Sequence, residues 1–141
     1  MRRHENLIPL SREHHQMLVV AQVLRNDVAP YKGMPTDFDQ KKAYLLDDKS
    51  PLILKNLNFH RKSFYPDLRK HSDKFEEIVE QLMELEDVII AHLMKANSID
   101  EEAIQEIAMT LQTIVRKRER ILYEKVQIEL EDWLDLKTLH A

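Results

Sequence analysis

The chain has 141 residues, a formal net charge of −4 and no cysteine. Its length fits one domain with a buried core, and the lack of cysteine excludes disulfides, thiolate nucleophiles and Cys-ligated zinc or iron–sulfur sites. A single glycine and a hydrophobic content of 43% favour an all-helical protein. The mild acidity gives no reason to expect nucleic-acid or membrane binding.

The sequence shows neither a membrane span nor a signal peptide. No stretch approaches the roughly 18 apolar residues of a span, and the apolar run after Met1–Glu5 is too short for a signal peptide. We therefore expect a cytoplasmic protein. We expect residues 1–141 to form one domain, with an N-terminal arm at 1–10 and a C-terminal extension at 131–141.

The first expected helix runs from about Ser11 to Asn26 or Val28. Ser11 is a favourable N-cap. Apolar residues then recur at helical spacing, at Met17, Leu18, Val20, Ala21 and Leu24. His14 lies on this stripe, whereas His15 is rotated by about 100° to its edge. We expect His14 to face the core, either as a metal ligand or as a helix-start histidine bonded to the backbone or to water.

A second helical region is expected over residues 37–66, after a loop at 29–36 that holds two prolines and the glycine. Pro51 predicts a kink or a break, with Ser50 as the N-cap if the helix restarts. His60 shares one helical face of the following stretch with Ile53 and Leu57.

Two further helices complete the pattern. The third is expected from about Ser72 to Ala96, and Ser98 opens a capping box for the fourth, which runs to about Leu130. Trp133 then anchors a terminal element together with its apolar neighbours, Leu134 and Leu136. Four amphipathic segments with short connections predict an all-α fold, an antiparallel up-down-up-down four-helix bundle.

Helical bundles often bind metal through paired ligands one turn apart. Glu-x-x-His precedes none of the seven histidines, and His-x-x-x-Glu does not occur. Leu18, Phe64 and Phe75 stand four residues after His14, His60 and His71, respectively. This pattern argues strongly against a carboxylate-bridged di-iron site of known type.

The chain nevertheless resembles the hemerythrin-like domains. The resemblance is clearest at LSREHHQMLVVAQVLR, Leu10–Arg25, and continues at Phe64-Tyr65-Pro66, which is similar to the Leu-Phe-Pro of that family. Residues 82–93 and ERILY at 119–123 extend it. The resemblance implies a four-helix bundle, and a family role in binding oxygen or handling iron or nitric oxide at a non-haem di-iron centre.

The family's ligand positions fall on residues that are mostly different here. The resemblance places them at His14 or His15, Asn56, His60, Asp87, Ile114 and Arg118. Ile114 has no donor atom, and Arg118 is a cation that would repel a metal. We therefore expect no cofactor, with iron or another divalent metal as the alternative.

Arg118 lies on the apolar stripe between Ile114 and Ile121. A buried arginine needs a partner, and the resemblance directs Asp87 into the same cavity. We therefore hypothesise an Asp87–Arg118 ion pair, with His14 and His60 as hydrogen-bond partners, in place of a metal centre. The alternative is that Arg118 extends along the helix into solvent and that Asp87 is a surface carboxylate.

Two functional classes follow. The first is a degenerate hemerythrin-like domain without a di-iron centre, acting as a structural, sensing or partner-binding module. The second is a metal-binding protein with an altered, mononuclear site at His14, His60 and Asp87, with His15 or Asn56 as additional ligands. Enzymatic activity is not expected. Nucleic acid and membrane are not expected partners, which leaves another protein or a second copy of the chain in a homodimer.

Overall fold

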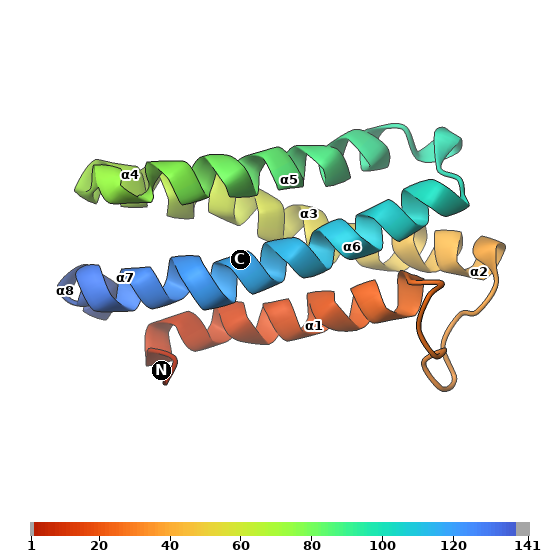
Figure 1. Cartoon of the computed structure of the whole chain (residues 1–141), viewed down its shortest axis with the longest axis horizontal. Helices are drawn as coiled ribbons and strands as arrows, with labels where there is room; N and C mark the ends of the chain where they lie inside the picture. Colours follow the sequence, from red (N-terminus) through yellow and green to blue (C-terminus); the bar gives the residue numbers. More distant parts are fainter. Residues whose placement is uncertain (1, 138–141) are drawn as a thin grey trace.

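The computed structural model describes residues 2–137, and every regular element within that range is helical (Figure 1). The predicted all-α fold class is confirmed. Within the same range, no helix combines the length and the apolar character needed to cross a bilayer. Residues 138–141 of the expected C-terminal extension lie outside the described residues.

Long helical segments lie side by side along the molecule (Figure 1). Helix α1, Ile8–Leu24, packs against α6, Glu101–Lys117, which in turn packs against α5, Glu76–Met94. A further segment is built from three short helices joined end to end, of which the middle one also contacts α5. These are α2 (Phe38–Ala43), α3 (Ser50–Phe59) and α4 (Tyr65–His71). Helices α7 (Tyr123–Glu129) and α8 (Glu131–Asp135) continue from α6.

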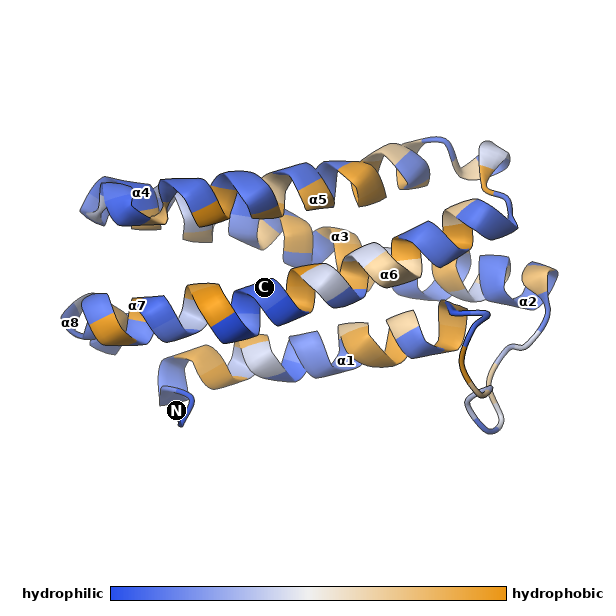
Figure 2. Ribbon diagram, viewed as in Figure 1, coloured by the Kyte–Doolittle hydropathy of each residue, from blue (hydrophilic) through white to orange (hydrophobic). Residues whose placement is uncertain are grey.

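The core lies where the apolar faces of these segments meet. Apolar residues recur along each helix and alternate with polar ones (Figure 2). The buried set draws from every long segment and includes Leu10, Met17, Leu57, Leu82 and Leu111, none of which is exposed. Burial of this apolar surface is the main force that holds the segments together.

The N-terminal residues are part of this core, so the prediction of an arm at 1–10 was wrong. Glu5–Leu7 form a 3-10 turn, α1 begins at Ile8, and Leu7 and Leu10 are fully buried. Pro9 occupies the first turn, where its missing N–H costs nothing. Ser11 is therefore inside the helix and is not its N-cap.

The helical segment between residues 38 and 71 is not broken at its prolines. Each proline lies two residues after the end of a π-helical turn, Tyr44–Lys49 before Pro51 and His60–Phe64 before Pro66. A proline clashes with the carbonyl four residues earlier, and the wider π turn relieves that clash. Ser50 does not act as an N-cap, because its hydroxyl donates to the Leu46 carbonyl oxygen at 2.8 Å.

The other helix ends follow local capping chemistry. Asp37 caps α2 by accepting from the Gln40 N–H. Asp100, not the predicted Ser98, caps α6 by accepting from the Ala103 N–H at 2.8 Å. At the C-terminal end, Trp133 and Leu134 are buried as expected, whereas Leu136 is exposed.

Candidate functional site: a buried arginine network

Arg118 is the largest fully buried side chain of the described residues. It begins a third π-helical turn, Arg118–Leu122, which joins α6 to α7 and contains no proline. Figure 2 shows a strongly hydrophilic stretch where α6 passes into this turn, with apolar residues on either side. The site is organised around this guanidinium.

The guanidinium makes four hydrogen bonds to side chains from α1, α3, α4 and α5. Nε donates to the Tyr65 hydroxyl at 3.1 Å. One terminal nitrogen, Nη1, donates to Asn56 Oδ1 at 2.6 Å and to His14 Nε2 at 3.1 Å. The other, Nη2, donates to Glu86 Oε2 at 3.0 Å. The cation thus links helices that are far apart in the sequence.

Glu86 supplies the negative charge. Its side chain is fully buried, like that of Arg118. Besides Arg118, its Oε2 accepts a 2.6 Å hydrogen bond from the Tyr65 hydroxyl, and its Oε1 lies 3.4 Å from Arg61. Tyr65 therefore donates to the carboxylate and accepts from the guanidinium, so it bridges the two charges.

His14 connects the buried guanidinium of Arg118 to the protein surface. Because guanidinium can only donate, His14 Nε2 must be the acceptor and Nδ1 must carry the proton. Nδ1–H then donates to Glu119 Oε2 at 2.6 Å. The carboxylate of Glu119 also accepts from Ser11 and pairs with Arg3, and its side chain is 23% exposed. The network reaches solvent through Glu119.

His60 has its tautomer fixed in the same way. Nδ1 faces the Asn56 carbonyl oxygen at 2.9 Å, and a carbonyl can only accept, so Nδ1 carries the proton. Nε2 therefore accepts from the Tyr123 hydroxyl at 2.7 Å. His60 does not touch Arg118 directly, but its ring stacks with those of His14 and Tyr123.

Asn56 completes the network toward α1. Its Oδ1 receives the Arg118 hydrogen bond, and its Nδ2 donates to Glu13 Oε1 at 2.9 Å. The amide orientation follows from these partners, because a guanidinium needs an acceptor and a carboxylate needs a donor.

The electrostatics keep one cation charged and both histidines neutral. Desolvation disfavours the charged guanidinium, but Tyr65 and Glu86 outweigh it and the pKa of Arg118 is raised. Burial, with the positive charge of Arg118, holds the pKa of His60 well below its usual value. Burial also lowers the pKa of His14, although the hydrogen bond to Glu119 opposes it. Burial raises the pKa of Tyr65 and of Tyr123, so both stay protonated.

The donor set does not fit a metal. A metal ion needs free lone pairs on its ligands, yet His14 Nε2, Asn56 Oδ1 and Glu86 Oε2 all accept from Arg118. His60 Nε2 is engaged by Tyr123. Within residues 2–137, no group of three or more His, Cys, Asp or Glu side chains is arranged to hold an ion.

Several site predictions agree with this geometry. Arg118 points inward, so the alternative of a solvent-extended arginine was wrong, and His14 rather than His15 faces the core. Asn56 and His60 lie in the network, and Ile114 is buried beside it in α6.

The predicted Asp87–Arg118 pair was wrong. Asp87 has a side chain that is 63% exposed, and it pairs with Arg61 at 2.8 Å. The buried partner is the preceding residue, Glu86, which lies four residues after Leu82 and three before Ile89, both buried. Asp87 is rotated from that face by about 100° and therefore points outward. The proposed metal site at His14, His60 and Asp87 is not assembled, since Asp87 faces away.

Sequence reasoning missed several members of the network, among them Glu86, Tyr65, Tyr123 and Glu119. For Glu86 the signal was available, because it occupies the apolar stripe of Val79, Leu82 and Ile89. Tyr65 and Tyr123 each follow a π-helical turn, which shifts the buried face by one residue. That shift is not visible in a 3.6-residue period.

Comparisons with known proteins give no family. The chain matches no protein-family model, no curated protein and no solved structure. The hemerythrin-like resemblance therefore stays a prediction.

Proposed function

We propose that this chain is a hemerythrin-like domain in which Arg118 takes the place of a di-iron centre. In this proposal the helical segments form an antiparallel up-down-up-down four-helix bundle. The contacts of α1 with α6, of α5 with α6 and of α3 with α5 support that arrangement. The domain acts as a structural, sensing or partner-binding module rather than as an enzyme.

One observation carries the proposal. Four buried acceptors from four helices converge on a single guanidinium, and one of them is a carboxylate that balances its charge. Such convergence on a central cation is what a metal site in a bundle requires. Here the cation belongs to the chain itself, so the polar core is complete without an exogenous ion.

The test is the metal content of the purified protein after expression in iron- and zinc-supplemented medium. Elemental mass spectrometry should find far less than one metal ion per chain. Adding iron, zinc or manganese should leave the midpoint of thermal unfolding unchanged. Stoichiometric metal in the wild-type protein that is lost in His60→Ala would overturn the proposal and establish a metal-binding function instead.

A further inference from the structure

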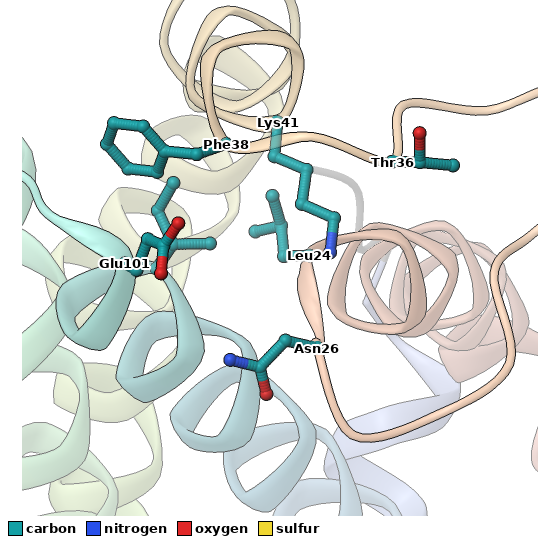
Figure 3. Close-up of a pocket in the computed structure, with 7 residues that line it drawn as sticks. Leu24, Asn26, Thr36, Phe38, Lys41 and Glu101 are labelled. Atoms are coloured by element: carbon teal, nitrogen blue, oxygen red, sulfur yellow. The ribbon is translucent and has the colours of Figure 1, made fainter.

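A second polar cluster surrounds a small cavity at the other end of α6, about 25 Å from Arg118 along the 17-residue helix. The cavity has a volume of about 110 Å³ and lies between the end of α1 and the starts of α2 and α6 (Figure 3). Leu24, Phe38 and Ile104 give it an apolar lining, and Asn26, Lys41 and Glu101 give it a polar one.

The two charged groups at this cavity are not paired with each other. Figure 3 shows Lys41 and Glu101 on different helices, with the cavity between them and Asn26 below. Within residues 2–137, neither forms a salt bridge. Lys41 Nζ has one hydrogen bond, to the Arg25 carbonyl oxygen at 3.1 Å, and an ammonium group has further N–H donors available.

Each charge also has a local role. The amine of Lys41, a residue of α2, lies at the C-terminal end of α1. Glu101 lies in the first turn of α6, so both charges are favourable to the helix dipoles. Those roles do not require the two side chains to border one cavity. Lys41 also borders a second cavity of about 160 Å³, next to the loop after α1.

We propose that this cavity binds a small aliphatic amino acid as its zwitterion. The ligand carboxylate contacts Lys41 Nζ and the Asn26 amide, and the ligand ammonium contacts Glu101. A short aliphatic side chain lies on Leu24, Phe38 and Ile104. The cavity has one positive and one negative group on opposite sides, which matches a ligand that carries both charges. Small-molecule sites typically combine an apolar lining with a small number of polar groups.

The volume limits the ligand. A cavity of about 10–15 Å³ on the same measure holds one water molecule, so this cavity has room for several water-sized groups. This suits a side chain of one to three carbons, with the charged groups toward the polar rim. The site does not involve Arg118, so the test of this proposal is independent of the test of the proposed function.

Calorimetric titration of the full chain tests the proposal. The probes are L-alanine, L-2-aminobutyrate and L-valine, with propionate and ethylamine as analogues that each lack one charge. The amino acids should bind one to one, and each analogue should bind about ten- to hundredfold more weakly, because one charged hydrogen-bonding contact is lost. Absence of detectable binding by every amino acid would overturn the proposal, as would propionate or ethylamine binding equally well.

Matched variants locate the site. Lys41→Met and Glu101→Gln should each weaken amino-acid binding by about ten- to hundredfold. Lys55→Met and Glu102→Gln, at exposed positions outside the cavity, should bind like the wild type. Glu101 is itself exposed at a helix start, so Glu101→Gln keeps the test valid if Lys41→Met does not fold. Unchanged affinity in Glu101→Gln would refute the assignment.

Discussion

Arg118 and Glu86 form an ion pair in which neither side chain is exposed to solvent, with Nη2 and Oε2 at 3.0 Å. Two such charges are costly to desolvate, and the pair is tolerable because Tyr65, Asn56 and His14 hydrogen-bond to it. The pair is therefore sensitive to the loss of either partner.

Removal of both charges should destabilise the fold by less than the sum of the two single removals. We expect Arg118→Met and Glu86→Gln each to lower the free energy of unfolding by about 3–5 kcal/mol, because an uncompensated buried group remains. The double variant should lose less than the sum of the two. Urea denaturation at a fixed pH measures all three.

Asp87→Asn serves as the control and should change stability by no more than about 1 kcal/mol, since its pair with Arg61 is exposed. Additive single losses would contradict coupling of the two residues.

The space left by the guanidinium should accept a replacement cation. In Arg118→Ala the four acceptors remain in place around a cavity, so free methylguanidinium at millimolar concentration should raise the midpoint of thermal unfolding. Wild-type protein should show no such rise. Sodium chloride at equal ionic strength controls for screening. A variant that responds to salt and methylguanidinium alike would argue against a formed cation site.

Stability should fall as the pH drops below about 6.5. The pKa values of His60 and His14 are lowered in the folded state, so the unfolded chain takes up protons first and gains free energy from them. Each histidine contributes at most about 1.4 kcal/mol per pH unit, and the effect is absent at higher pH, where the histidine is neutral in both the folded and the unfolded chain.

His60→Gln should flatten the dependence of unfolding free energy on pH between 7 and 5.5. His15→Gln, at the exposed neighbouring position of His14, should not. Equal slopes in wild type and His60→Gln would rule out a buried neutral His60.

The hydroxyl groups of the two buried tyrosines, Tyr65 and Tyr123, should contribute unequally to the free energy of unfolding. Tyr65→Phe removes a hydroxyl that serves both Glu86 and Arg118, whereas Tyr123→Phe removes only the donor to His60 Nε2. Hydrogen bonds to charged groups contribute about 1.5–3 kcal/mol and neutral ones about 1 kcal/mol. Tyr65→Phe should therefore be the more destabilising in chemical denaturation. A larger loss in Tyr123→Phe would place the main polar contribution at His60 instead.

The N-cap of α6 offers a local test. Asp100→Ala should cost about 1 kcal/mol, because the Ala103 N–H loses its acceptor. Ser98→Ala, the site suggested by the capping-box pattern, should be nearly neutral. Thermal unfolding of the two variants side by side distinguishes them, and a reversed order would restore Ser98 as the cap.

The helical class and the inward members of the network could be predicted because they depend on periodicity. His14, His60 and Arg118 all lie on apolar stripes, and a polar side chain on such a stripe must be buried or must turn away. The partner of Arg118 was misplaced by one residue because the family pattern was preferred to the stripe through Leu82, Glu86 and Ile89. Caps were misplaced for a related reason, since Ser11, Ser50 and Ser98 have the right chemistry but not the right backbone position.

The π-helical turns account for most of the remaining differences. Prolines mark two of them, at Pro51 and Pro66, so a disturbance of the helix could be anticipated there. Nothing in the composition marks the third. Ile121, expected on the buried stripe, is 47% exposed, while Leu122 and Tyr123 are fully buried. A single period carried through Arg118 assigns the wrong residues to the core beyond it.

The turn at Arg118–Leu122 also sets how this helix tolerates changes in length. The buried residues before it and those after it belong to two rotational phases, joined where the guanidinium enters the core. Removing one residue from the turn would restore a uniform helix in which Leu122, Tyr123 and Val126 keep their buried face, because the turn displaces that face by one residue. The packing on both sides of the turn is therefore compatible with the loss of one residue, whereas the addition of one would rotate these three side chains by about 100° away from their neighbours.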